Sequence, residues 1–215
     1  MENLIEVRGL CKQYPGFSLD HVDLTVPAGA IVGLIGENGA GKTTTIKAIL
    51  NVIRPDGGVV KLLGRTPGDP AAREGAAAVF EDSYFYGGFT TRQISRSMAG
   101  ICKNWDEALF ASYCSRFELG DRKPVKDFSR GMRMKLSLAT ALARHPRLLV
   151  LDEATSGLDP VVRGEILDIF LEFIQDEHCG VLLSSHITTD LERIADHAVN
   201  IAQWAIFCVT GELLG

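Results

Sequence analysis

The chain has 215 residues, 46% of them hydrophobic and 23% charged, so it is long enough to bury a sizeable core and too apolar to be disordered. Its net charge of -5 argues against a general nucleic-acid-binding protein, and we expect no nucleic acid among its partners. No apolar run approaches the roughly 20 residues that span a bilayer, the N-terminus is acidic where a secretory signal would be basic, and the scattered cysteines indicate reduced, cytoplasmic thiols.

The N-terminal region alternates apolar and polar residues in the manner of half-buried strands. The two alternating segments are residues 4–8 and 17–26, with a Tyr14-Pro15-Gly16 turn between them. We therefore expect an antiparallel sheet here. Tyr14 has two interpretations, because its ring could pack on the strand ends or stack on a nucleotide base.

A glycine-rich segment from Gly36 to Thr43 matches the phosphate-loop pattern G-x-x-x-x-G-K-[ST]. An apolar strand-like run (residues 30–35) precedes it and a helical pattern (43–50) follows it, which disfavours a chance glycine-rich turn. Backbone N–H groups of such a loop, together with the helix N-terminus, bind a polyphosphate. The residues expected to hold it are Asn38, Gly39, Ala40, Gly41, Lys42, Thr43 and Thr44.

Within this loop, two side chains have specific predicted roles. Lys42 would place its ammonium group against the β- and γ-phosphates. The Thr43 hydroxyl would complete the coordination of a Mg²⁺ ion that bridges them.

The middle of the chain changes from strand-like to helical patterns. Short strands are expected at residues 57–64 and 76–80, and a polar and aromatic loop at 81–88 follows the second. Beyond it we expect helices near 91–99, 106–117 and 132–145 and no strand, which indicates a helical lobe inserted into the sheet domain.

Sheet structure is expected to resume after this lobe. A buried parallel strand at residues 147–153 ends in two carboxylates, and another at 181–184 leads to Ser185-His186. A helix should separate them at 160–177. A helix near 188–195 and strands near 198–202 and 205–209 complete the prediction.

The residues at these strand ends suggest ATP hydrolysis. Asp152 would hold Mg²⁺ through its water shell, and Glu153 could accept a proton from a water that attacks the γ-phosphate. His186 could contact the γ-phosphate or orient that water. Alternatively, the acids are solvated or cap the next helix, and the histidine is structural.

Five motifs in a fixed order extend this interpretation. They are the phosphate loop, Phe128-Ser129-Arg130-Gly131-Met132, the strand that ends in Asp152-Glu153, Ser156-Gly157-Leu158-Asp159 and Ser185-His186. In this order they resemble the ATP-binding subunit of ABC transporters, over nearly the whole chain.

The resemblance implies an α/β fold: a P-loop NTPase core with a mixed or parallel sheet, an N-terminal antiparallel β subdomain and an inserted helical subdomain. Residues 1–215 would form one ABC-type ATPase domain. Residues 1–89 and 146–215 would form the core, and about 90–145 the helical subdomain.

The resemblance also implies a dimer. Two such subunits, identical or sister chains, would face each other head to tail and enclose ATP between them. Ser129 and Gly131 would contact the γ-phosphate bound to the opposite subunit, and Asp159 would connect the two sites. Glu81 aligns with the glutamine loop that reports nucleotide state to a transmembrane permease, and Tyr14 with the aromatic residue that stacks on adenine.

The chain departs from the usual family pattern at two places. Its signature has Arg130 and Met132 where L-S-G-G-Q has glycine and glutamine, and Glu81 replaces the loop glutamine. A carboxylate at position 81 can still hold a metal-bound water. Such variants resemble those of bacterial exporter and immunity systems, in which the membrane domain is a separate chain.

We therefore expect an ATP hydrolase that powers a permease from the inner face of the cell membrane, with ATP and Mg²⁺ as ligands. Lys42, Glu153 and His186 are the expected catalytic residues, and Thr43, Glu81 and Asp152 the metal-binding ones. The alternative is a nucleotide-gated regulatory or immunity module with little turnover. An ABC-type ATPase acting on DNA or ribosomes is disfavoured by the acidic net charge.

Overall fold

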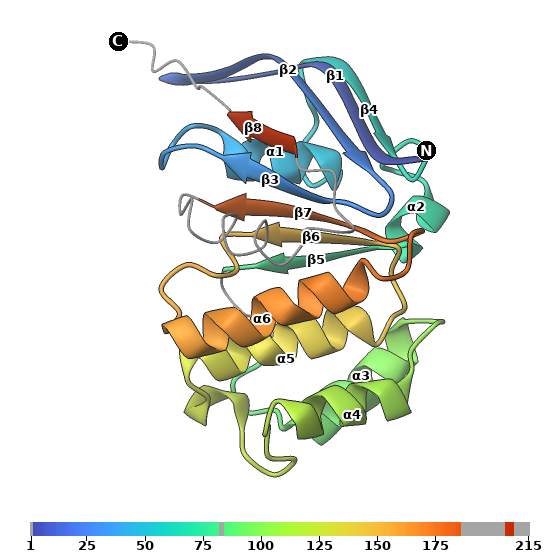
Figure 1. The fold of residues 1–215 in the computed structure, drawn as a ribbon, viewed down its shortest axis with the longest axis vertical. Coiled ribbons are helices and arrows are strands. Elements are labelled where there is room, and N and C mark those ends of the chain that lie inside the picture. Colours follow the sequence, from blue (N-terminus) through green and yellow to red (C-terminus); the bar gives the residue numbers. More distant parts are fainter. Residues whose placement is uncertain (1, 82–83, 186–204, 209–215) are drawn as a thin grey trace.

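The computed structural model describes residues 2–81 and 84–185 and the backbone of 205–208. Two sheets and a group of helices make up the molecule (Figure 1). The predicted helix near 188–195, the predicted strand near 198–202 and His186 lie outside the described residues.

The N-terminal sheet is antiparallel, as predicted, and has the order β2-β1-β4. Its strands are β1 (Asn3–Tyr14), β2 (Phe17–Pro27) and β4 (Gly57–Leu62). β1 is longer than the predicted strand, because the chain continues past Gly9 through register shifts that keep it paired with both neighbours.

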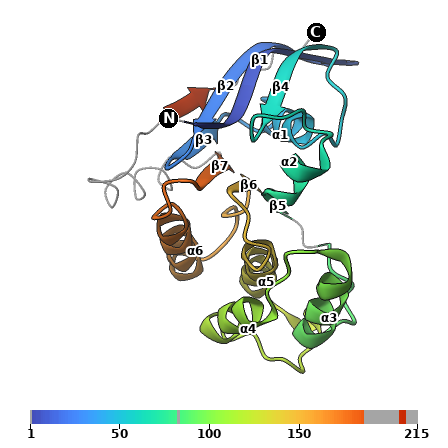
Figure 2. The same ribbon diagram turned by 90° about the vertical axis from the view of Figure 1, so that its right-hand side faces the viewer.

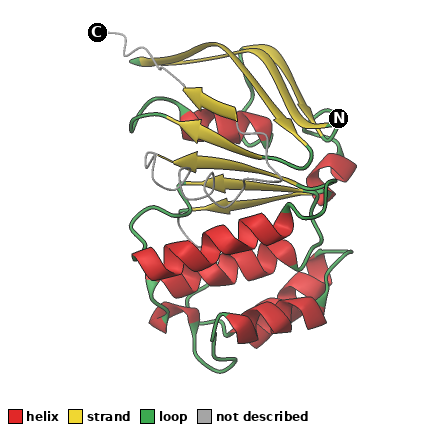
Figure 3. Ribbon diagram, viewed as in Figure 1, coloured by secondary structure: helices red, strands yellow, loops and turns green. Residues whose placement is uncertain are grey.

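The second sheet is parallel and has the order β5-β6-β7-β3-β8. Its strands are β3 (Ile31–Ile35), β5 (Ala76–Phe80), β6 (Leu148–Asp152), β7 (Gly180–Ser185) and β8 (Ala205–Cys208). The chain alternates strands and helices as the periodicity predicted, with all five strands running the same way (Figure 3).

The central strands β3, β6 and β7 of the parallel sheet are buried on both faces. Val32, Leu34 and Val150 point to the side that holds the antiparallel sheet and α1 (Lys42–Ile49), and Ile31 and Leu149 point to the helices on the other side. This alternation explains why these strands are nearly continuous apolar runs.

The remaining helices cover the second face and extend beyond it (Figure 2). Apart from the short α2 described below, these helices are α3 (Thr91–Ile101), α4 (Glu107–Arg116), α5 (Arg130–Leu142) and α6 (Pro160–Phe173). α5 and α6 lie against the sheet, while α3 and α4 form the outer helical lobe with α5. Between residues 90 and 147, all of which the structure describes, there is no β-strand, in agreement with the prediction.

Two details differ from the sequence prediction. α2 (Pro70–Glu74), capped by the Asp69 carboxylate, was not predicted because five residues carry too little periodicity to reveal a helix. The predicted helix at 160–177 is shorter, because α6 ends at Phe173 and a turn leads into β7. No helix among the described residues has the length and apolar character needed to cross a bilayer.

The parallel register brings the predicted site segments to one edge of the sheet. Ile35 is level with Ser185, Ser184 with Asp152, and Asp152 with Phe80. The phosphate loop, Glu153 and Glu81 therefore leave neighbouring strands at the same carboxyl-terminal edge, where α/β sheets bind ligands.

Candidate functional site

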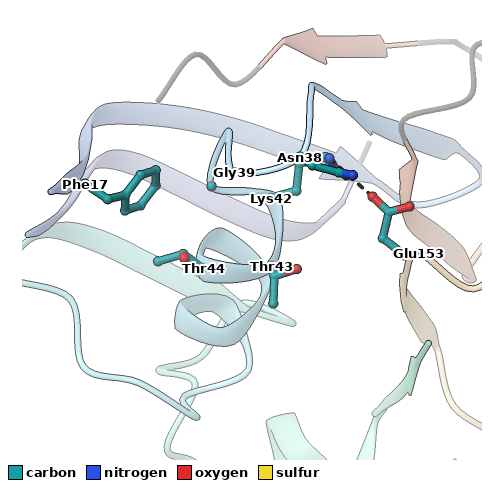
Figure 4. A pocket seen from close by; sticks show the side chains of 8 residues that line it. Phe17, Asn38, Gly39, Lys42, Thr43, Thr44 and Glu153 are labelled. Atoms are coloured by element: carbon teal, nitrogen blue, oxygen red, sulfur yellow. Dashed lines mark ion pairs between the residues drawn. The ribbon is translucent and has the colours of Figure 1, made fainter. Parts of the chain in front are cut away.

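A cavity of about 400 Å³ lies over the phosphate loop and the N-terminus of α1 (Figure 4). Side chains from α1 and from the end of β6 converge on it, and β2 contributes an aromatic ring. The lining residues are Phe17, Asn38, Gly39, Gly41, Lys42, Thr43, Thr44 and Glu153. The predicted phosphate-binding segment and the predicted catalytic glutamate therefore share one cavity.

Gly41 is required by the conformation of this loop. Its φ of 99° lies in the left-handed region, and a Cβ atom here would lie 2.3 Å from Leu19 Cδ2 and 2.9 Å from Phe17 Cζ. The Thr45 hydroxyl donates to the Gly41 carbonyl at 3.0 Å, which closes the first turn of α1. The loop is thus pressed against β2, and the start of α1 faces the cavity.

Lys42 is buried, with 5% of its side chain exposed, and its ammonium group has three oxygen neighbours. Nζ donates to the carbonyls of Gly36 at 2.7 Å and Glu37 at 3.0 Å, and lies 3.2 Å from Glu153 Oε1. The three donors of an ammonium group thus have acceptors in this conformation. A phosphate that enters the cavity has to replace some of them.

Asp152, the last residue of β6, and Glu153, which follows it, are joined through one buried hydroxyl. Ser184 Oγ donates to Asp152 Oδ1 at 2.7 Å and accepts the N–H of Glu153 at 3.0 Å. Glu153 has a φ of 53°, an uncommon conformation for a residue other than glycine and one that recurs at functional sites. Ser184, which sequence reasoning did not single out, therefore positions both acids.

The residues near this edge also fit Mg²⁺. Asp152 is almost fully buried at the end of β6, and the Thr43 hydroxyl lines the cavity. A carboxylate and a hydroxyl are hard oxygen donors, which Mg²⁺ prefers over nitrogen or sulfur. The chemistry of this donor pair is compatible with the predicted metal.

The predicted signature residues lie at helix N-termini. The Ser129 hydroxyl accepts the N–H of Met132 at 3.2 Å as the cap of α5, and Asp159 caps α6 by accepting the N–H groups of Val161 and Val162. Gly131 permits a close approach of the two helices, since a Cβ atom there would lie 3.1 Å from Val162 Cγ1.

Glu81 does not line the cavity but forms an ion pair with Arg130, with Nη2 2.6 Å from Oε1. Its predicted contact with a metal-bound water stays a prediction. The pairing joins two of the three positions, 81, 130 and 132, at which the sequence departs from the usual family pattern.

Tyr14 also lies outside the set of residues that line the cavity. It is 41% exposed, and Lys12 Nζ lies 5.4 Å from its ring centroid. Phe17, its register partner across the β1–β2 hairpin, is the aromatic residue in the cavity wall. Sequence reasoning missed Phe17, although its place on the far side of the predicted turn was a usable signal.

Comparison with known proteins identifies relatives of this chain. The family model described as ABC transporter matches residues 19–156. A PhoU domain model matches residues 164–205, which include most of α6 and all of β7. Because β7 lies inside the parallel sheet and α6 packs in the same core, the described part of this match forms no separate unit.

Curated relatives include the bacitracin transport ATP-binding protein BcrA of Bacillus licheniformis, 33% identical over 92% of this chain and 66% of BcrA. The daunorubicin/doxorubicin resistance ATP-binding protein DrrA of Streptomyces peucetius is 34% identical over 97% and 66% of the two chains. The lantibiotic transport ATP-binding protein SrtF of Streptococcus pyogenes is 31% identical over 90% and 84%. The chain thus spans about two thirds of the length of BcrA and DrrA.

Solved structures share the fold. A structure described as the ATP binding subunit of an ABC transporter superposes with a TM-score of 0.78 at 29% identity, covering 98% of this chain and 90% of the other. CbiO1 from Clostridium perfringens, described as part of the ABC transporter complex cbiONQ, gives the same TM-score of 0.78 at 20% identity, over 98% and 86% of the two chains.

Proposed function

The chain belongs to the ABC transporter family, and we propose that it is an ATP-binding and ATP-hydrolysing subunit that powers a separate membrane permease. The observation that carries the proposal is the position of Glu153, which lies in the same cavity as the phosphate loop and 3.2 Å from Lys42. A carboxylate at this position is suited to act on a water at the γ-phosphate.

The phosphate chain is held by the loop and by Lys42. N–H groups at the start of α1, which lines the cavity, would bind phosphate oxygens, and Lys42 would exchange contacts that include Glu153 for the β- and γ-phosphates. Thr43 and Asp152 would hold Mg²⁺, whose charge offsets that of the phosphates. Tyr14 and Phe17, which flank the turn of the β1–β2 hairpin, are the candidates for stacking on adenine.

Hydrolysis then depends on Glu153. ATP draws Lys42 toward the phosphates and away from Glu153, whose carboxylate accepts a proton from the attacking water. Ser184 holds the Glu153 backbone during this step. His186 retains its proposed role at the γ-phosphate.

We propose a head-to-tail dimer with two ATP molecules between the subunits. The N-terminus of α5, with Ser129 and Gly131, would face the γ-phosphate of the partner, where its positive dipole favours an anion. Asp159, at the start of α6, would connect the sites. We treat residues 1–215 as one ATPase domain whose helical subdomain, residues 90–145, carries the signature.

The proposed permease contact lies beside Glu81. Tyr84 and Tyr86 are 81% and 71% exposed, and Tyr84 lines a cavity of about 220 Å³ together with Phe80, Phe85, Met98 and residues of α5. An exposed aromatic surface of this kind suits a short amphipathic helix of the permease. The chain would then be a cytoplasmic protein held peripherally at the membrane. A regulatory module with little turnover is not favoured, because Lys42, Asp152 and Glu153 are all retained.

Nucleotide binding and turnover test this proposal. Titration calorimetry with Mg·ATP should give binding for the natural chain and none for Lys42→Ala, and phosphate release should disappear with it. Lys47→Ala, on the same helix but outside the cavity wall, is the matched control and should behave like the natural chain. Unchanged ATP affinity in Lys42→Ala would refute the phosphate-loop assignment.

A further inference from the structure

Arg130 connects three segments that the site depends on. It begins α5, its guanidinium forms the 2.6 Å ion pair with Glu81 at the end of β5, and it lies over Gly157 in the loop between Glu153 and α6. The φ of Gly157 is 64°, a conformation that favours glycine, and a Cβ atom there would lie 2.7 Å from Arg130 Nη1, so the guanidinium packs closely on this residue. The contacts fix Arg130 between the helical lobe and the sheet edge.

Glu81 follows β5 at the same sheet edge as Asp152, the predicted metal-binding acid. Phe80 is level with Asp152 in the parallel pairing of β5 and β6, so Glu81 begins one residue beyond the level of the buried acid. Neighbouring strands lie about 4.8 Å apart. Glu81 therefore adds a third carboxylate to the edge that carries Asp152 and Glu153, and Arg130 neutralises it.

A glutamine at 81 and a glycine at 130 could not form this pair, whereas the two residues present here do. The unusual residues at positions 81 and 130 therefore form a single interaction. We propose that the Arg130–Glu81 ion pair is a latch that withholds Glu81 from the metal, so that Arg130 sets the Mg²⁺ concentration needed for ATP binding. This inference rests on the proposed binding of Mg·ATP at the phosphate loop.

Opening of the latch has a second consequence. When Glu81 turns to a metal-bound water, Arg130 loses its anionic partner beside Ser129, at the N-terminus of α5. A free guanidinium at this place favours an approaching phosphate. Metal binding in one subunit thereby prepares its signature segment for the nucleotide of the other.

The test measures the Mg²⁺ concentration at half-maximal binding of a fluorescent, non-hydrolysable ATP analogue to the full chain. Arg130→Met frees Glu81 and should lower this midpoint about two- to fivefold, the range expected for breaking an exposed ion pair. Glu81→Gln should raise it, and the double variant should match Glu81→Gln alone, because Arg130 acts through Glu81.

Arg116→Met is the matched control. Arg116 forms a bidentate ion pair with Glu172 of α6, both distances 2.6 Å, and so joins the helical lobe to the rest of the chain without touching the sheet edge. It should change thermal stability but not the Mg²⁺ midpoint. Equal shifts in Arg116→Met and Arg130→Met would overturn the latch, as would effects of Arg130→Met and Glu81→Gln that simply add.

Two further results keep the proposals distinct. If the natural chain binds no analogue at any Mg²⁺ concentration, the proposed function fails; if it binds but Arg130→Met leaves the midpoint unchanged, only the latch fails. Should Arg130→Met not fold, Arg130→Lys, which keeps the charge but not the planar fork, should give a smaller decrease of the midpoint. An unchanged midpoint in a folded Arg130→Lys would then refute the latch.

Discussion

Lys42 Nζ and Glu153 Oε1 lie 3.2 Å apart, and 5% and 15% of these two side chains are exposed. The phosphate-binding lysine and the proposed base are therefore partners before nucleotide enters. In the proposed mechanism ATP competes with Glu153 for Lys42, so binding of the γ-phosphate and separation of this ion pair are one event. Lys42 would then leave Glu153 only when there is a phosphate to attack.

Glu153→Gln should therefore bind ATP more tightly than the natural chain, with an affinity higher by roughly a few-fold. A neutral amide competes less for Lys42 and repels phosphate less. Calorimetry with Mg·ATP measures the change. Glu165→Gln, which removes an acid paired with Lys135 away from the cavity, is the control and should leave the affinity unchanged. A tenfold loss of affinity in Glu153→Gln would contradict this competition.

Ser184→Ala should impair both stability and turnover. It leaves the Glu153 N–H and Asp152 Oδ1 without their buried hydroxyl partner, at a cost of about 1–3 kcal/mol in the free energy of unfolding. Urea unfolding and phosphate release measure the two effects. Ser137→Ala is the control, because the hydroxyl that it removes donates to a carbonyl of its own helix. Stability and turnover of this variant should stay near the natural values. Normal turnover in Ser184→Ala would show that this hydroxyl does not position the acids.

Two buried thiols should resist alkylation. Burial raises the pKa of Cys114 to about 12, and burial, with a smaller effect of Asp176, raises that of Cys179 to about 11. The reactive thiolate is therefore scarce at pH 8. Mass spectrometry after brief iodoacetamide treatment should find both unmodified in the folded chain and modified in urea. Equal labelling in the two conditions would contradict their burial.

Acid should destabilise the fold through carboxylates whose pKa is lowered. The hydrogen bond from the Leu109 N–H and, as a smaller effect, the one with His145 lower the pKa of Asp106. The Arg116 guanidinium lowers the pKa of Glu172. Such groups stabilise the folded state above their ordinary values of 3.8 and 4.5, and this contribution is lost as the pH falls through the lower folded values.

Urea unfolding between pH 7 and pH 2.5 measures this loss, which should begin near pH 4.5. Glu172→Gln lowers stability at pH 7 and should flatten the pH dependence. An equally steep decrease in that variant would show that the Arg116 pair contributes nothing to it.

The segments with strong local patterns could be predicted from the sequence. The phosphate loop, the buried strands and the acids at the end of β6 lie where predicted, because glycine spacing, apolar runs and strand-end carboxylates are local signals. The length of α6 was overestimated, since the apolar pattern continues through residues that form a turn.

The contacts that adjust the site could not be predicted in this way. Arg130 and Glu81 are 49 positions apart, and Ser184 and Asp152 are 32 apart. Their pairing follows from the register of parallel strands and the packing of α5 against the sheet, which no single segment encodes. Arg130, Glu81 and Asp152 could be singled out from the sequence, but which residue each one pairs with is visible only in the structure.

The most direct test of the account is ATP turnover as a function of chain concentration, with Glu153→Gln measured beside the natural chain. The account predicts turnover that rises more steeply than linearly as dimers form, no turnover in Glu153→Gln, and a Glu153→Gln dimer at saturating Mg·ATP. Turnover strictly proportional to concentration, or a Glu153→Gln variant that hydrolyses ATP at the natural rate, would contradict it.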